Sequence, residues 1–252
     1  SSGEGTTSQG DFHEALNWAS NAKAPVIFHI QDNEYAISTH KSEQTADSVY
    51  NMTAGYKNLS RYDVDGTDFF EANLAFDQAI ERARKGKGPS VIISNVVRLL
   101  PHSSSDDQRK YRTEKSLNED KKRDPLKVLE DQCLKAKFIS ASEFKNIRDK
   151  AIEQVDKDAE WADGQDYPDP NTALDHIYSN DDIHDEPSYN AISDKIVIVD
   201  AINHALHEEM ARNKNMVIYG QDIADPKGGV FTATKGLSDS FGSERVFNSP
   251  LA

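Results

Sequence analysis

The hydrophobic pattern of the first hundred residues alternates between helical spacing and short apolar runs. Apolar residues spaced three to four apart predict a helix over residues 12–22, and a β-branched and aromatic run predicts a strand over residues 26–30. The pattern then repeats as a short strand (61–64), a helix (68–85) and an apolar strand (90–97). Strand, helix and strand in this order predict parallel pairing, and a nearly continuous apolar strand predicts burial on both faces. The expected fold class is therefore α/β, a parallel sheet with helices on both faces.

The apolar positions of the two predicted helices indicate the side chains that should face this sheet. In the first helix they are Phe12, Ala15, Leu16, Ala19 and Ala22; in the second they are Phe69, Leu74, Phe76 and Ile80. We expect each set to pack on the core because it lies near one face of its helix. Residues 40–47, between the two units, read as a long polar loop, for which a lid and an ordinary surface crossing are both open.

The rest of the chain predicts further helices and then a second unit. Residues 124–161 read as helical with a break at residues 139–140, and residues 179–194 are acidic and weakly apolar, as in a linker. After the linker the pattern predicts a helix over residues 201–211, a short strand over residues 216–219 and a turn-rich stretch. We therefore expect three parts, namely a first domain (1–178), the linker (179–194) and the start of a second α/β domain (195–252).

Composition narrows the classes of protein that fit. Hydrophobic residues make up 37% of the 252 residues and charged residues 29%, and no segment approaches the roughly twenty apolar residues of a membrane span. The net charge of −14 argues against nucleic acid and anionic membranes as partners, but leaves a basic protein partner open. The single cysteine, Cys133, cannot form an intramolecular disulfide, so a cytoplasmic location is the simplest expectation.

Candidate chemistry is concentrated at the start of the chain. Gly3, Gly5 and Gly10 let the backbone turn tightly before the first helix, where N–H groups can approach an anion. Glu4 precedes this helix and Asn33 follows the next strand, so both should lie at the carboxyl edge of a parallel sheet, where ligands of such sheets bind. Carboxylate and amide oxygens suit Mg²⁺, which keeps other positions for water and phosphate. The pattern predicts a magnesium-diphosphate site but leaves a plain structural turn open.

A second group of polar residues follows the strand over residues 90–97. His102 stands beside three serines, Ser103, Ser104 and Ser105, and Arg98 precedes them. Taken alone, such a segment is most often a polar surface loop. A Ser–His nucleophilic pair would need a third orienting group and an oxyanion site, which the sequence does not identify.

Residues 3–17 (GEGTTSQGDFHEALN) and 32–39 (DNEYAIST) closely resemble the thiamine-diphosphate motif of the decarboxylating components of 2-oxo acid dehydrogenases. The resemblance implies that Glu4, Asn33 and the carbonyl of Tyr35 hold Mg²⁺. Together with the loop that follows the strand over residues 90–97, it also implies that the cofactor binds to Gly5, Thr6, Gln9, Ile37, Arg98 and His102. The chain departs from the motif at Asp32, where Asn is usual, and at Glu34, where Gly is frequent, which adds negative charge beside the metal ligands.

The loop after the strand over residues 90–97 resembles the His-Ser-x-Ser-Asp-Asp…Tyr-Arg loop of branched-chain 2-oxo acid dehydrogenases. This likeness implies that His102 reaches the cofactor diphosphate and the substrate, and that Arg98 is a weaker candidate for contact with an anion. Residues 195–252 resemble the start of the pyrimidine-binding subunit of the same enzymes. In that subunit a Gly-Glu-Asp turn supplies a glutamate that contacts the pyrimidine ring and helps to activate the cofactor. This chain has Gln221 at that catalytic position. Its amide can still hydrogen-bond to the ring nitrogen but has no carboxyl proton to share, so a proton relay would need Asp222, another residue or a less efficient route.

Together these resemblances imply a thiamine-diphosphate- and Mg²⁺-dependent oxidoreductase with both subunit types fused on one chain. Its reaction would be oxidative decarboxylation of a 2-oxo acid, with transfer of the acyl group to the lipoyl arm of an acyltransferase core. A branched-chain acid is preferred, pyruvate and acetoin are alternatives, and a homodimer is expected. From a different class, the chain could be a non-catalytic interaction fragment that keeps the fold. Since no strand is expected before Gly3 and the second domain stops early, we expect a piece of a longer protein that is inactive alone.

Overall fold

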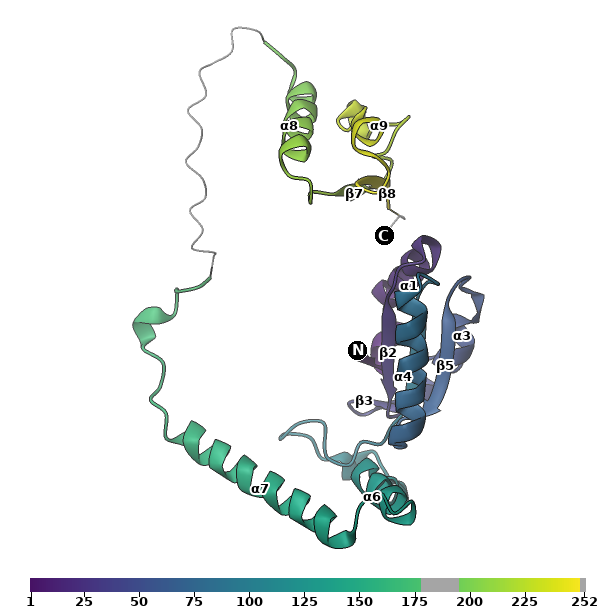
Figure 1. The fold of residues 1–252 in the computed structure, drawn as a ribbon, viewed down its shortest axis with the longest axis vertical. Coiled ribbons are helices and arrows are strands. Elements are labelled where there is room, and N and C mark those ends of the chain that lie inside the picture. The colour runs from purple at the N-terminus through teal and green to yellow at the C-terminus, as the bar shows by residue number, and fades with distance from the viewer. Residues whose placement is uncertain (178–194, 250–252) are drawn as a thin grey trace. The chain divides into compact units, whose positions relative to one another are not determined.

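The computed structural model describes residues 1–177 and 195–249 and divides into two compact units, residues 1–141 and 142–249 (Figure 1). Strands alternate with helices in both units. The expected α/β class is therefore confirmed. The expected linker, residues 179–194, lies outside the described residues, and the expected domain limits stay predictions.

The first unit is built on a four-stranded parallel sheet. Its strands, in spatial order, are β1 (Ser2–Gly3), β2 (Ile27–Asp32), β6 (Ser90–Asn95) and β5 (Ser60–Asp65). The parallel pairing predicted from the strand, helix and strand pattern is confirmed. The expectation that no strand precedes the glycine-rich turn was wrong. Ser2 and Gly3 pair with Ile30 and Gln31, a two-residue strand too short to leave a pattern in the sequence.

Two helices cover the two faces of this sheet. Along β6, alternate side chains point to opposite faces. Val91 and Ile93 therefore join the core beneath α1 (Gly10–Ala22), whereas Ile92 packs under α4 (Phe69–Arg84), the helix that lies across the sheet in Figure 1.

The core-facing side of each helix differs in part from the expectation. In α1, Phe12, Leu16 and Ala19 are buried as predicted, but Ala15 and Ala22 are exposed. In α4 the fully buried residues are Ala75 and Ala79, while Phe69 and Leu74 are more than half exposed. Small alanine side chains let α4 lie close to Ile92, and this turns two of its large apolar residues outward.

The polar loop expected over residues 40–47 is ordered instead. A short antiparallel hairpin, β3 (Tyr35–Ala36) with β4 (Thr39–His40), leads directly into α2 (Lys41–Gln44), and α3 (Val49–Met52) follows. The hairpin reverses the chain just after β2, so α2 lies against the 3-10 helix η1 (Glu4–Ser8). Residues 39–44 therefore form a strand and a helical turn, and the choice between a lid and an ordinary surface crossing stays a prediction.

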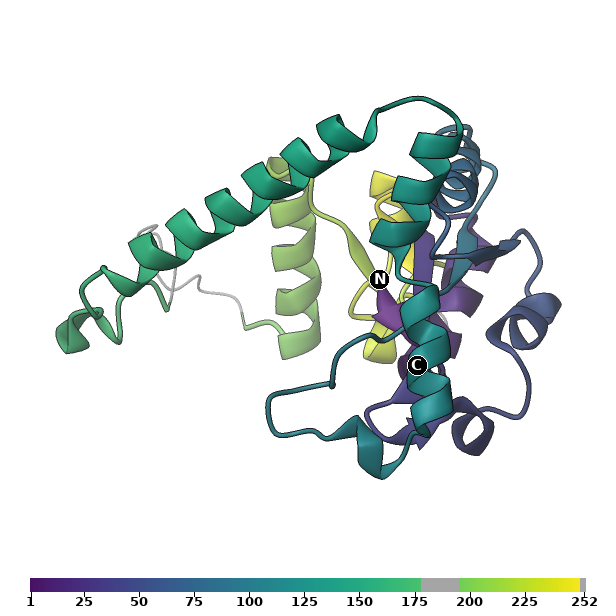
Figure 2. The same ribbon diagram turned by 90° about the horizontal axis from the view of Figure 1, so that it is seen from below.

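After β6 the chain forms mainly helices. They are α5 (Glu114–Lys122), α6 (Pro125–Lys135) and α7 (Ala141–Asp163), the long helix seen in Figure 2, with the short 3-10 helices η3 (Gln108–Lys110) and η4 (Pro170–Thr172). The predicted break between two helices is confirmed at residues 136–140. Among the described residues, no helix has the length and apolar character needed to span a membrane.

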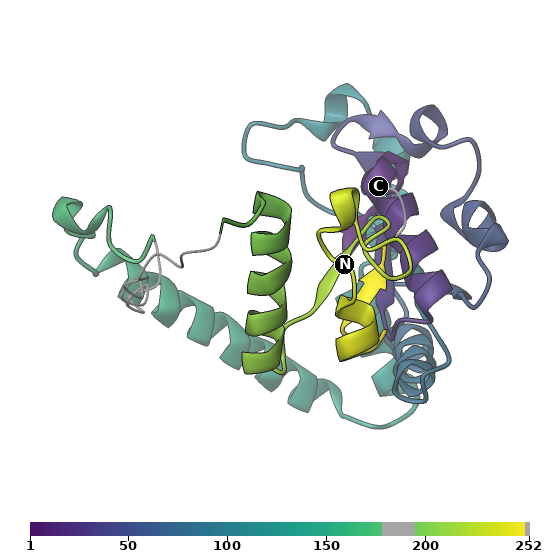
Figure 3. The same ribbon diagram turned by 90° about the horizontal axis from the view of Figure 1, so that it is seen from above.

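Residues 195–249 form a smaller α/β group, visible in Figure 3. It comprises α8 (Ile198–Arg212), β7 (Ile218–Gly220), the 3-10 helix η5 (Val230–Thr232), α9 (Leu237–Phe241) and β8 (Val246–Asn248), which pairs in parallel with β7. The buried residues of its core are Met210, Leu237 and Val246. The predicted helix and strand are both present, each displaced by one to three residues at its ends.

Candidate functional site

A pocket of about 360 Å³ lies at the carboxyl ends of β1, β2 and β6. Its lining is Gly3, Glu4, Gly5, Thr6, Gln9, Asn33, Tyr35, Ala36, Ile37, Arg98 and His102. Every residue that the sequence suggested for the metal or the cofactor, apart from Gln221, is in this lining. The parallel sheet gathers them because the segments that carry them all leave strands at the same edge. Their individual roles stay predictions.

Glu4 is the buried acid of the pocket. It is 2% exposed, and its Oε2 accepts a hydrogen bond from the Asn33 backbone N–H at 3.3 Å. Its other oxygen, Oε1, is buried without a hydrogen-bond partner. Burial raises the pKa of Glu4, although backbone hydrogen bonds partly offset this effect. A buried carboxylate oxygen without a donor is a position that a cation would satisfy.

Asn33 lies in a tight turn directly after β2. The Asn33 Oδ1 accepts from the Tyr35 N–H at 3.2 Å, and the Asp32 Oδ1 accepts from the Glu34 N–H at 2.9 Å. Glu34, between Asn33 and Tyr35, has the left-handed φ of +71° that such turns need. An amide oxygen has two lone pairs, so Asn33 can still bind a second group.

The donor atoms of this pocket fit Mg²⁺. One carboxylate oxygen, one amide oxygen and the Tyr35 carbonyl are hard oxygen ligands, and Mg²⁺ takes its remaining ligands from water and phosphate. Over residues 1–177 and 195–249 the structure holds no cluster of three or more His, Cys, Asp or Glu side chains placed to bind a metal. The pocket therefore suits a cation that uses few protein carboxylates.

Gly5 allows the glycine-rich turn to pack closely against the neighbouring hairpin and helix. A β-carbon at this position would lie 2.6 Å from the Ala36 Cβ, too short for a side chain, and 3.2 Å from the Gln44 Oε1, a tight contact. The absence of a side chain lets η1 pack directly on the β3–β4 hairpin and α2. The backbone N–H groups of the glycine-rich turn thus remain beside Glu4, where an anion can approach them.

The two departures from the motif, Asp32 and Glu34, are both paired with Lys41. The Lys41 Nζ lies 3.3 Å from the Asp32 Oδ2 and 3.1 Å from the Glu34 Oε1. Burial lowers the pKa of Lys41, but its hydrogen bonds to the two carboxylates and their charges outweigh burial, so the pKa is raised overall. Lys41 therefore stays charged, and sequence reasoning missed it because only the hairpin brings it back to the turn.

Arg98 is held in place by two contacts across the pocket. Its Nη1 donates to the Ile37 carbonyl at 2.7 Å, and its Nη2 donates to the Tyr111 hydroxyl at 2.6 Å. Ile37 has a left-handed φ of +56°, which belongs to the bend of the hairpin. Arg98 thus ties the hairpin to the loop over residues 98–112.

The same network reaches His102 through Asp106. The Tyr111 hydroxyl donates to the Asp106 Oδ2 at 2.7 Å, and the His102 N–H donates to the same oxygen at 2.9 Å. The His102 side chain is exposed and forms no hydrogen bond with a serine of its loop, where Ser103 pairs with Ser105. The geometry thus offers His102 to the pocket and gives no support to a Ser–His nucleophile.

Arg112 is a buried residue that sequence reasoning also left without a role. Its side chain is 2% exposed and forms an ion pair with Asp120. Its Nη1 donates to the Arg98 carbonyl at 3.1 Å, and its guanidinium carbon lies 5.1 Å from the centre of the Tyr35 ring. Arg112 thus supports both Arg98 and the ring of Tyr35. The Tyr-Arg pair in the loop motif was the available signal.

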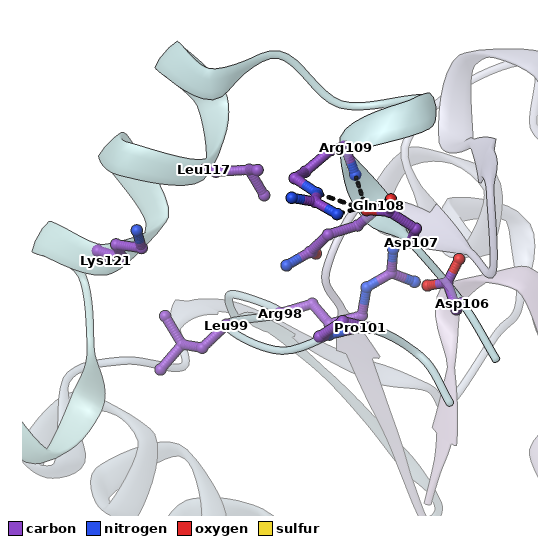
Figure 4. Close-up of a pocket in the computed structure, with 9 residues that line it drawn as sticks. All are labelled: Arg98, Leu99, Pro101, Asp106, Asp107, Gln108, Arg109, Leu117 and Lys121. Atoms are coloured by element: carbon purple, nitrogen blue, oxygen red, sulfur yellow. Dashed lines mark hydrogen bonds and ion pairs between the residues drawn. The ribbon is translucent and has the colours of Figure 1, made fainter. Parts of the chain in front are cut away.

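A second pocket of about 360 Å³ lies beside Arg98, between the loop and α5 (Figure 4). Of its five charged side chains, Asp107 and Arg109 form an ion pair with each other. The Arg109 Nε and Nη2 donate to the two carboxylate oxygens of Asp107 at 2.8 and 2.9 Å, and these bonds lower the pKa of Asp107 to about 2. The charges of Asp107 and Arg109 therefore offset each other in this pocket.

Gln221 lies in the second unit, at the end of β7, and its side chain is exposed. The next residue, Asp222, has a left-handed φ of +56°, and its carbonyl accepts from the Gly229 N–H at 2.9 Å. The turn is therefore well defined, but the role expected for Gln221 stays a prediction.

Comparison with known proteins gives two family matches on this one chain. A family described as "dehydrogenase E1 component" matches residues 1–171, and one described as "transketolase, pyrimidine binding domain" matches residues 194–252. Both are families of thiamine-diphosphate-dependent enzymes. The resemblance noted in the sequence is thus confirmed, while Mg²⁺ binding stays a prediction.

Similar curated proteins carry the names of two enzymes. The 2-oxoisovalerate dehydrogenase subunit alpha of Bacillus subtilis (strain 168) is 36% identical over 178 residues, which is 70% of this chain and 54% of that protein. Pyruvate dehydrogenase E1 component subunits alpha are 45% identical in Staphylococcus epidermidis and 42% identical in Staphylococcus aureus, each over 125 residues. These 125 residues are 49% of this chain and 34% of each relative.

The chain therefore spans between a third and about half of the length of these relatives. The match to the dehydrogenase E1 component family nevertheless covers 171 of the 252 residues of this chain and includes every residue that lines the pocket. On this evidence the chain belongs to the dehydrogenase E1 component family, and the relatives named above are alpha subunits of 2-oxo acid dehydrogenases.

Proposed function

We propose that this chain carries the Mg²⁺-diphosphate part of a thiamine-diphosphate-dependent 2-oxo acid dehydrogenase, followed by the start of its pyrimidine-binding part. The observation that carries this proposal is the buried Glu4 Oε1, which has no donor and lies in the pocket that also contains Asn33 and Tyr35. The reaction proposed is oxidative decarboxylation of a 2-oxo acid with transfer of the acyl group to a lipoyl group.

One set of residues would bind the metal ion and a second set would bind the diphosphate of the cofactor. Glu4, Asn33 and the Tyr35 carbonyl would hold Mg²⁺, while the backbone around Gly5 and the side chains of Thr6 and Gln9 would hold the diphosphate. The exposed Ile37 side chain offers an apolar contact at the pocket mouth. When bound, thiamine diphosphate supplies the electron sink for decarboxylation.

Arg98 and His102 would act on the anionic groups at the pocket. Two hydrogen bonds fix the Arg98 guanidinium, so its positive charge needs no rearrangement to face an anion. His102, anchored by its backbone to Asp106, presents an exposed imidazole that can exchange a proton or stabilise negative charge on the substrate side.

Gln221 would contact the pyrimidine ring without taking part in proton transfer. Its amide can donate or accept a hydrogen bond but has no proton to share at neutral pH. The second proposal, of another class, is a non-catalytic interaction fragment that keeps the fold and binds no cofactor; the departures from the family motif at Asp32 and Gln221 favour it.

A branched-chain 2-oxo acid is the proposed substrate, because residues 102–107 resemble the loop of that subfamily and a relative is named 2-oxoisovalerate dehydrogenase. Pyruvate is the alternative that the other relatives support, and acetoin is a further one. The proposed setting is a cytoplasmic homodimer that works with a lipoyl acyltransferase core.

Calorimetric titration of the full-length protein with thiamine diphosphate and Mg²⁺ tests the function. We expect saturable binding that requires Mg²⁺, and a loss in Asn33→Ala greater than the roughly 10- to 100-fold typical of an outer-sphere partner. The matched control is Asn73→Ala, which removes an exposed amide on α4 that bonds to Asp77. Absence of binding by the wild type would favour the non-catalytic alternative, and normal binding by Asn33→Ala would contradict the metal assignment.

A further inference from the structure

The turn that carries Asn33 is flanked by two carboxylates and one ammonium group. Asp32 and Glu34 stand on either side of Asn33, and the Lys41 Nζ bridges them at 3.3 and 3.1 Å. The motif that this segment resembles usually has Asn and Gly at these two positions. This chain therefore has two additional negative charges beside the proposed site, together with a cation that contacts both.

Asp32 depends on the ion pair with Lys41 more than Glu34 does. Its side chain is 9% exposed, whereas those of Glu34 and Lys41 are 55% and 35% exposed. A carboxylate removed from water to this extent is costly unless it is paired and hydrogen-bonded. Asp32 receives one bond from the Glu34 N–H and one from Lys41, so removal of the ammonium would leave a buried charge with half of its partners.

Lys41 also links the two segments that supply the proposed metal ligands. Its backbone N–H donates to the Glu34 carbonyl at 2.8 Å, so Lys41 is bound to the Asn33 turn by backbone and side chain. It begins α2, whose last residue, Gln44, accepts from the Ser8 hydroxyl at 3.4 Å and lies against Gly5. The turn with Asn33 and the segment with Glu4 are thus connected through this one helix.

We propose that Lys41 is a positioning residue of the Mg²⁺-diphosphate site, whose ammonium neutralises Asp32 and Glu34 and holds the Asn33 turn in its ligand-binding shape. This inference rests on the proposed function, since it concerns the same site. Without the ammonium, two uncompensated carboxylates would repel the anionic diphosphate and each other. The turn would then relax away from Glu4.

The test is titration of the full-length protein with Mg²⁺ and thiamine diphosphate, which measures affinity rather than turnover. Lys41→Met keeps most of the length of the side chain and removes its charge, and we expect affinity to fall roughly 10- to 100-fold, as for other outer-sphere partners. Lys41→Arg, which keeps the charge, should stay much closer to the wild type. The matched control is Lys85→Met, which removes an ion-paired lysine directly after the last residue of α4.

A triple variant separates charge neutralisation from every other role. In Lys41→Met combined with Asp32→Asn and Glu34→Gln, the two carboxylates are gone, and we expect affinity within about threefold of the wild type, far above the single variant. The amide that replaces the Asp32 carboxylate keeps an oxygen for the bond from the N–H of position 34. If Lys41→Met does not fold, a folded triple variant with normal affinity still supports the proposal.

Three results would overturn the inference and leave the proposed function standing. They are unchanged affinity in Lys41→Met, an equal loss in the Lys85→Met control, and a triple variant that folds but binds no better than Lys41→Met. Failure of the wild type to bind, in contrast, would remove the proposed function itself.

Discussion

The two α/β regions of the chain differ in how completely they enclose their candidate chemistry. Residues 1–141 build a four-stranded sheet with a core on each face, and nine residues suggested for the site line one pocket there. Residues 195–249 have a pair of three-residue strands and one small core, and Gln221 is exposed at the end of one strand.

The outer surface of the second region reinforces this contrast. Ile198, Val230 and Phe231 are 80%, 73% and 85% exposed, and Phe231 has a left-handed φ of +52° that a bulky side chain rarely adopts. The difference teaches that motif residues line a pocket only where the strands and helices that carry them are packed on a core. The first region meets this condition by itself, and the predictions below test how far the two regions differ.

The largest expected effect is on stability. Arg112→Met removes the buried arginine of an ion pair in the first region and leaves Asp120, whose side chain is 21% exposed. It should lower the free energy of unfolding by about 3 kcal/mol, the low end of the cost of breaking a buried pair. Arg212→Met removes an ion-paired arginine of the second region whose side chain is 75% exposed, and should cost less than about 0.5 kcal/mol. Urea denaturation measures both. Equal losses would mean that the first region is no better enclosed than the second.

The next effect is on turnover. His102→Ala should lower kcat by about one to three orders of magnitude, the scale of a lost acid, base or charge-stabilising group. The exposed imidazole makes no side-chain hydrogen bond in its loop, so the melting temperature should change little. Steady-state kinetics and calorimetry on the full-length protein check both quantities. Normal kcat with a large fall in melting temperature would show that His102 serves the fold.

A smaller effect is expected at Gln221, in the second region. Gln221→Glu introduces a carboxyl group that can transfer a proton where the amide cannot, and should speed exchange of the cofactor's thiazolium proton by a few-fold or more. NMR measurement of this exchange in the full-length protein is the check. A slower or unchanged rate would place the proton relay at Asp222 or elsewhere, because an added charge beside Asp222 is then only unfavourable.

The smallest effects concern pH, where the two regions should respond in opposite senses. Burial raises the pKa of Glu4 above its ordinary 4.5, so metal-free protein should lose stability as pH rises from that value through the raised pKa. Hydrogen bonds, first from the Gly236 N–H and then from the Ser238 hydroxyl, lower the pKa of Asp225 below 3.8. The contribution of the Asp225 carboxylate to the stability of the second region is present above pH 3.8 and is lost as pH falls through the lowered pKa.

Amide hydrogen exchange in metal-free buffer can follow each region separately. Glu4→Gln should remove the loss on the alkaline side from the first region, and Asp225→Asn the loss on the acid side from the second. If both regions weakened in the same direction, either the effect of burial on Glu4 or the effect of hydrogen bonding on Asp225 would be misjudged.

The strands and helices near the pocket were predictable because their signals are local. The apolar run before Asp32 predicts β2, and Asp68 marks the start of α4, where its carboxylate accepts from the Phe70 and Glu71 N–H groups. The buried face of α4 was not predictable from hydrophobicity. Contact with the sheet selected Ala75 and Ala79 for their small size, whereas the pattern favoured Phe69 and Leu74.

The members of the pocket were predictable from the motif, but the contacts that hold them were not. Lys41 reaches Asp32 only because the β3–β4 hairpin reverses the chain, and the sequence over residues 40–47 shows no pattern beyond polarity. Tyr111 and Arg112 act on Arg98 across 13 or 14 positions of loop and 3-10 helix. Side-chain contacts of this kind depend on the path of irregular backbone, which no periodicity encodes.

The order of strands in the sheet also determines when the pocket can form during folding. Ile27 of β2 pairs with Ser90 of β6, and β5, which lies between them in sequence, joins at the edge. Closing a chain segment of this length costs about 4 kcal/mol of entropy beyond a constant, so the central pairing is a late and slow event, whereas α1 and the hairpin are local. Asn33 follows β2 and Arg98 follows β6, and hence the two sides of the pocket meet only after that event. A ligand that binds there therefore slows unfolding without speeding folding.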